Sequence, residues 1–150
     1  MSKAHYGRLL LMIALSFASM YVLMYAMVDR LSNVYASLNQ VYMAGLMTAP
    51  MVVIELALMG AMYPDKRKNV VILAAGLLAL IVFWILIRQQ TAISDKQFLR
   101  SMIPHHAGAV LMCQKAPIQD PGVKQLCRTI IAGQQAEIEQ MKLRLNELEK

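Results

Sequence analysis

Residues 94–122 read "SDKQFLRSMIPHHAGAVLMCQKAPIQDPG", a stretch that holds the start of one helix, its end and a turn. Ser94 and Gln97 have the spacing of a capping box, in which both side chains bind free N–H groups of the first turn. The pattern predicts a helix over about 95–115. The seven residues 116–122, "APIQDPG", contain two prolines, an aspartate and a glycine and therefore predict a turn.

A second helix is predicted after this turn, from about residue 123 to the C-terminus, because its apolar residues recur at helical spacing. These residues are Leu126, Ile130, Ile131, Ile138, Met141, Leu145 and Leu148. Two helices joined by a short turn form an antiparallel hairpin. Such a hairpin buries little apolar surface alone, so we expect it to complete a four-helix bundle by self-association, as a homodimer or higher oligomer.

The two cysteines, Cys113 and Cys127, lie near the end of the first of these helices and near the start of the second. Folding of the hairpin brings them close together. We expect a disulfide between them, which is permitted outside the cytoplasm and which would contribute about 2–4 kcal/mol of stability. The alternative is two buried free thiols.

The region before the hairpin has the composition of a membrane protein. The whole chain is 58% hydrophobic and only 16% charged, and its apolar residues lie in three long blocks. A helix of about 20 apolar residues spans a bilayer. We therefore expect a transmembrane region over 1–90, with helices over about 9–28, 41–63 and 70–88, and a hairpin domain over 91–150. The first block is longer than the apolar core of a cleaved signal peptide, so we expect it to be retained.

Basic residues predict the orientation of this region. Lys3 and Arg8 precede the first block and residues 66–68 of the second loop are Lys-Arg-Lys, whereas the first loop has only Arg30. The positive-inside rule places the N-terminus in the cytoplasm of a bacterial-type inner (plasma) membrane and the hairpin in the periplasm or outside the cell. Much of the net charge of +6 flanks the apolar blocks, where it meets the lipid bilayer, so we expect no nucleic-acid partner.

The first hairpin helix carries a candidate metal site. Met102, His105 and His106 stand at positions i, i+3 and i+4 and share one face of the helix. Folding of the hairpin places Glu137 and Met141 of the second helix within about one turn of their level. The candidate metal ligands are Met102, His105, His106, Met112, Glu137 and Met141.

Ligand softness favours copper at this site. Thioethers bind Cu(I) and Ag(I) well, and imidazole binds copper and zinc. Structural zinc sites use cysteine and histidine at fixed spacings, and the sequence has no Cys-x-x-Cys pair, so zinc is the less favoured metal. Pro104 also frees a backbone carbonyl close to the histidines. The alternative is that the methionines fill a core and that the histidines only form hydrogen bonds.

The two stretches "FLRSMIPHHAGAVLMC" (98–113) and "LCRTIIAGQQAEIEQMK" (126–142) resemble the repeat unit of the "domain of unknown function 305" family, over about 95–142. The resemblance implies a ferritin-like helical domain, and some members of the family bind copper in the periplasm. The six candidate ligands fall on the family's pattern. Members commonly carry two such hairpins in one chain, whereas this chain carries one, which again implies an oligomer. Ala107 follows the histidine pair where the family often has a polar residue.

Methionines also recur in the first two apolar blocks and are absent from the third. Met43, Met47, Met51, Glu55 and Met59 follow one another at intervals of four residues. A carboxylate inside a membrane indicates a functional site. One hypothesis is an intramembrane metal path that comprises Met20, Met24, Met27, Met43, Met47, Met51 and Glu55. The alternative, which we favour, is that the thioethers fill gaps between helices and that Glu55 is protonated or bonded to a Tyr or Ser.

These observations predict an all-α membrane protein whose extracytoplasmic hairpin binds Cu(I), or Ag(I), for copper handling or tolerance. A partner that delivers copper is left open. The competing hypothesis is an oligomeric membrane scaffold in which the histidine pair is structural. We expect no enzyme, because the sequence has no nucleophile–base pair, no phosphate loop and no Glu-x-x-His motif, although copper redox activity at the site stays open.

Overall fold

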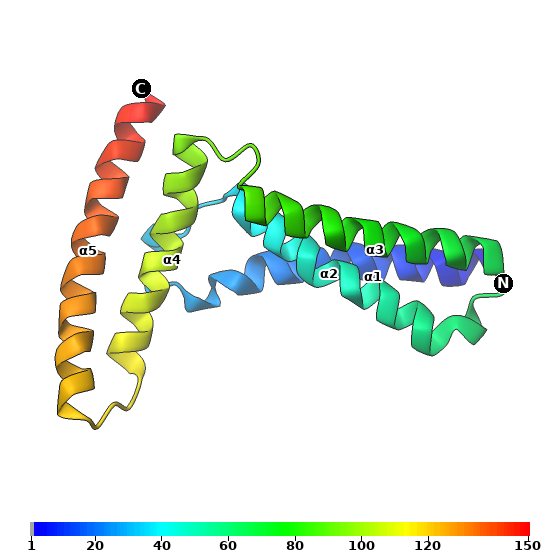
Figure 1. Cartoon of the computed structure of the whole chain (residues 1–150), viewed down its shortest axis with the longest axis horizontal. Coiled ribbons are helices and arrows are strands. Elements are labelled where there is room, and N and C mark those ends of the chain that lie inside the picture. Colours follow the sequence, from blue (N-terminus) through cyan, green and yellow to red (C-terminus); the bar gives the residue numbers. More distant parts are fainter. Residues whose placement is uncertain (1) are drawn as a thin grey trace. The chain divides into compact units, whose positions relative to one another are not determined.

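The computed structural model of the chain describes residues 2–150, and these residues form five α-helices and no strand. The all-helical class is thus confirmed. The helices are α1 (Ser2–Leu23), α2 (Leu38–Met59), α3 (Lys66–Gln89), α4 (Asp95–Lys115) and α5 (Pro121–Glu149), with 3-10 turns η1 (Met24–Met27), η2 (Leu31–Asn33) and η3 (Gly60–Met62) between them. The backbone divides into two compact units (Figure 1). Unit 1 holds α1, α2 and α3, and unit 2 holds Met24–Leu38 together with Ala92–Lys150.

Among residues 2–150, three helical segments are long and apolar enough to cross a membrane, and most of their residues lie in unit 1. They cover His5–Met27 (23 residues), Leu38–Met62 (25 residues) and Lys66–Gln89 (24 residues). Each begins a few residues before its apolar block, because helical hydrogen bonding continues into the polar flank. At the start of α3, for example, the Asp65 carboxylate accepts hydrogen bonds from the backbone N–H groups of Arg67 and Lys68, both at 3.1 Å.

The helices of unit 1 contact one another through small residues and one apolar cluster. Gly45 of α2 lies so close to the Phe83 ring of α3 that a Cβ atom at position 45 would overlap it. Leu9, Leu56 and Tyr63 form the buried cluster. In the most apolar stretch of the first and the third segment only 6% is buried, and in that stretch of the second segment 33% is buried. Most of the apolar surface of unit 1 therefore faces outward.

In unit 2, α4 and α5 lie side by side in opposite directions and form the predicted hairpin (Figure 1). The helix α4 has the predicted bounds, and the Ser94 hydroxyl accepts from the Gln97 N–H at 3.5 Å. The side chain of Gln97 does not complete the capping box, because its Oε1 accepts from the Leu38 N–H at 2.8 Å. The helix α5 begins at Pro121, two residues earlier than expected, since proline suits the first helical turn and the Asp120 carboxylate caps the Val123 N–H at 2.8 Å.

The core of unit 2 has three contributors. Buried residues of the two helices form its centre: Ile103, Ala107, Val110, Ile138 and Leu145. Val28 and Tyr35, from the segment between α1 and α2, cover it. The Tyr25 hydroxyl donates to the Tyr35 carbonyl at 2.7 Å and holds this segment in shape. The segment lies close to α4 at Gly108, where an added Cβ would be in ordinary van der Waals contact with the Met27 carbonyl oxygen at 3.5 Å.

A disulfide joins Cys113 of α4 to Cys127 of α5, as expected from the sequence. Their Cα atoms are 5.2 Å apart and their positions differ by 14 residues. The bridge lies close to the turn, so it fixes the end of the hairpin at which few core residues are available.

Candidate metal site

The structure brings together two of the candidate ligands, His106 of α4 and Glu137 of α5. The His106 Nδ1 atom lies 3.1 Å from the Glu137 Oε2 atom. The histidine side chain is 15% exposed and the glutamate side chain 53% exposed, so the pair sits at the edge of the interface between the helices. Although the distance is short, the angle between the groups is not that of a hydrogen bond, and the buried Nδ1 atom has no hydrogen-bond partner among residues 2–150.

Burial lowers the pKa of His106 below its usual value. The Glu137 carboxylate acts in the opposite direction and raises the pKa, and the neighbouring His105 lowers it further. The effect of burial is the largest, so the ring is neutral near pH 7. A neutral imidazole keeps a lone pair for a metal ion and does not have to lose a proton before it binds.

His105 and His106 point in different directions. Their ring centroids are 5.9 Å apart, with 56° between the ring planes. His105 is exposed, whereas His106 turns toward α5. Consecutive residues of a helix are rotated by about 100°, so one chain presents one histidine to its own second helix and the other to its surroundings.

Two of the three thioethers flank the His106–Glu137 pair. Met102 precedes His106 by one helical turn and is half-buried, and Met141 follows Glu137 by one turn and packs against the hairpin core. Met112 is exposed and stands six residues beyond His106, about 9 Å along the helix axis and on another side of it. Helical spacing thus puts Met102 and Met141 one turn from the His106–Glu137 pair, whereas His105 and Met112 are exposed.

Within residues 2–150, no three side chains of His, Cys, Asp or Glu gather closely enough to hold a metal ion. Both cysteines are in the disulfide. The candidate side chains one helical turn from the pair are the thioethers of Met102 and Met141.

The candidate residues of the intramembrane path are divided between the two units. In α2, Met43 and Met47 are exposed, while Met51 and Glu55 are half-buried. The Glu55 carboxylate accepts a hydrogen bond from the Tyr63 hydroxyl at 2.9 Å, the kind of partner that the alternative of simple helix contacts expects.

The remaining path residues come from the first segment. Met20 is a half-buried residue of α1. Met24 and Met27 lie in η1 and belong to unit 2, where Met27 adjoins Gly108 of the helix that carries the histidines. No local signal predicts that these methionines leave the first helix, because the apolar block runs on without a break.

Comparison with known proteins matches the chain to one family model and to one viral protein. Residues 85–145 match the model of the family described as Domain of unknown function (DUF305). An uncharacterized protein of Acanthamoeba polyphaga mimivirus is 35% identical over 142 residues, which cover 93% of this chain and 91% of that protein. No solved structure matches. The chain belongs to the family of this viral protein, and the match to the DUF305 model lies in its C-terminal part. Neither match indicates a catalytic activity.

Proposed function

We propose that this chain is a membrane-anchored metal-binding protein whose hairpin binds Cu(I), or Ag(I), for copper handling or tolerance. One observation carries the proposal: the His106 Nδ1 atom is buried, lacks a hydrogen bond and lies 3.1 Å from a carboxylate oxygen of the facing helix. Two ligand atoms of one tetrahedral ion, each about 2.0–2.1 Å from the metal, lie about 3.3 Å apart, so the pair has the spacing of two ligands.

The thioethers beside this pair support copper rather than zinc. Met102 and Met141 stand one turn from His106 and Glu137, respectively. Thioether sulfur prefers Cu(I) and Ag(I) over zinc and over hard cations. The exposed His105 and Met112 complete no site within one chain, and they are ligands that a second hairpin or a copper-delivery protein can share.

The membrane part of the proposal rests on the outward-facing apolar surface of unit 1 and on the distribution of basic residues. Lipid is the solvent that such helices require. Positions 66–68 are all basic, which favours a cytoplasmic second loop and an extracytoplasmic hairpin. The disulfide agrees with this orientation, because disulfides persist outside the reducing cytoplasm.

A second candidate function, an oligomeric scaffold, is favoured by the apolar residues that the hairpin leaves uncovered. Phe98 of α4 and Leu126 and Leu143 of α5 are 49%, 57% and 66% exposed. Exposed side chains of this kind are covered when helices pair into a four-helix bundle. In this case the His106–Glu137 contact is only a polar link between two helices.

A Cu(I) titration against a chromophoric chelator distinguishes the two candidates. The protein is purified in detergent in a C113S/C127S background, so that cysteine thiolates do not bind the metal. We expect the parent to bind Cu(I) tightly. The affinity of the H105A/H106A variant should be lower by more than the roughly 10–100-fold that follows removal of a group that only supports a ligand. Size-exclusion chromatography with light scattering gives the oligomeric state of each variant.

The matched control is His5→Ala, which removes the third histidine of the chain, in α1. It should bind Cu(I) like the parent. Equal binding by H105A/H106A and H5A contradicts a metal site on the hairpin, and a change of oligomeric state without any metal binding supports the scaffold.

A further inference from the structure

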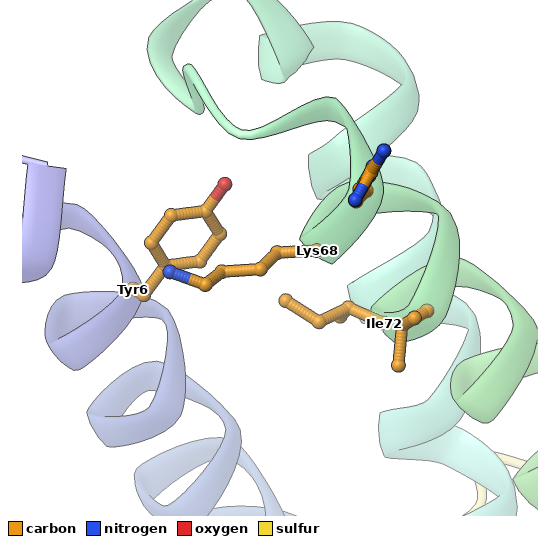
Figure 2. A pocket seen from close by; sticks show the side chains of 5 residues that line it. Tyr6, Lys68 and Ile72 are labelled. Atoms are coloured by element: carbon orange, nitrogen blue, oxygen red, sulfur yellow. The ribbon is translucent and has the colours of Figure 1, made fainter.

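Unit 1 has a pocket of its own between α1 and α3, with a volume of about 490 Å³. Tyr6 of α1 forms one wall, and Arg67, Lys68, Val71 and Ile72 of α3 form the other. Figure 2 shows the Lys68 side chain extended toward the Tyr6 ring, with Ile72 on the same helix beyond it. The pocket is thus basic at its rim and apolar inside.

The rim of the pocket is held in place by contacts within unit 1. The Lys68 Nζ atom lies 5.5 Å from the centre of the Tyr6 ring, a cation–π distance, and 3.3 Å from the Asp65 Oδ2 atom. The Tyr6 hydroxyl donates to the Asn69 Oδ1 atom at 2.8 Å. The two helices therefore meet at a fixed, polar end, and Val71 and Ile72 give the pocket an apolar wall on α3.

The charge at this end is positive and largely unpaired. Residues 66–68 carry three positive charges, against the one negative charge of Asp65. The backbone N–H of Lys68 is the largest of the influences that lower the pKa of Asp65, so that carboxylate is ionised at neutral pH. Within the described residues 2–150, the Arg67 guanidinium has no hydrogen bond or ion pair. An arginine of this kind is ready to bind an anion through two parallel N–H groups.

We propose that this pocket binds one anionic phospholipid, with its phosphate on Arg67 and Lys68 and an acyl chain against Val71 and Ile72. The spacing fits a lipid, because Ile72 follows Lys68 by four positions, which places this part of the apolar wall about 6 Å further along the helix axis. Basic pockets between membrane helices on the cytoplasmic side suit such headgroups. The inference rests on the membrane part of the proposed function and is independent of the metal site.

Native mass spectrometry of the full chain in detergent tests this site. The protein is incubated with equal amounts of phosphatidylglycerol and phosphatidylcholine that have the same acyl chains. We expect roughly 25-fold more phosphatidylglycerol than phosphatidylcholine in the one-lipid complex, and a ratio near one for the R67Q/K68Q variant, since each of the two basic residues near anionic lipid contributes about fivefold.

The matched control, R88Q/K96Q, removes the same charge from the other end of α3 and from α4. It should keep the preference for phosphatidylglycerol. Equal loss in both variants, or no preference in the parent, overturns the site. Full competition by glycerophosphate, which has no acyl chain, also overturns it, because a free anion would then suffice. Release of the parent from membranes by alkaline carbonate instead contradicts the membrane anchor itself, and the copper titration is unaffected by any of these outcomes.

Discussion

The pKa of His106 is set by opposing influences from two helices. Burial at the edge of the hairpin and the neighbouring His105 lower it, and Glu137 of α5 raises it. The net lowering keeps the imidazole neutral, so the residue is both a candidate ligand and a group whose protonation opposes folding.

This balance predicts how the stability of the metal-free protein depends on pH. Because the folded chain holds the pKa of His106 below its usual value, the unfolded chain binds the proton more readily. The contribution of His106 to stability is complete above the unfolded pKa of about 6.5, and it is lost as the pH falls through the folded pKa. We expect the midpoint temperature of thermal unfolding to decrease when the pH is lowered from 7.5 to 5. The decrease should be smaller in a His106→Gln variant. An identical fall in both proteins would assign the dependence to groups other than His106.

The disulfide between α4 and α5 should carry much of the stability of the hairpin, because the core there is small. It closes a loop whose ends are 14 residues apart, so the C113S/C127S variant should lose about 3 kcal/mol of unfolding free energy in unit 2. The loss is measured by denaturant unfolding, with proteolytic cleavage of α5 as the signal for unfolding. Its matched comparison is the parent protein reduced in place, which should behave like the variant. An unchanged unfolding midpoint would show that the segment Met24–Leu38 and the helix contacts suffice without the bridge.

The hairpin was predictable from the sequence because its signals are local. Ser94, Asp120 and Pro121 begin helices through contacts within a few residues, and the paired cysteines follow from the turn. The packing of Val28 and Tyr35 against the core of the hairpin was not predicted. These residues lie in the mostly polar stretch "DRLSNVYASLNQ" and its flank, and only a tertiary contact makes such a stretch part of a core.

The candidate site was predictable to a similar extent. The length of the turn predicts that His106 and Glu137 lie at about the same height along the hairpin, and the structure places these two residues together. The prediction that His105 and His106 share one face does not include the rotation of about 100° between neighbouring residues of a helix. In the structure His105 is exposed, as is Met112. The division of the first apolar segment at Leu23, after which η1 joins unit 2, also has no local signal.

At the scale of the whole molecule, the chain combines an apolar unit with a hairpin that carries the candidate ligands. The match to the viral protein covers 93% of the chain, whereas the DUF305 model matches residues 85–145. Unit 1 supplies the proposed anchor and the lipid site, and unit 2 supplies the proposed copper site. The two proposals can fail separately, since no residue is shared between them.

The measurement that tests the central proposal most directly is X-ray absorption at the copper edge of the Cu(I)-loaded protein in the C113S/C127S background. With both cysteines replaced, methionine supplies the sulfur. The account predicts nitrogen and sulfur atoms bonded to the same copper, and loss of the sulfur signal in an M102L/M141L variant but not in an M112L control. A spectrum with sulfur alone would place the copper on methionines without the imidazole and contradict a site at His106. Nitrogen and oxygen alone would contradict the role of the thioethers.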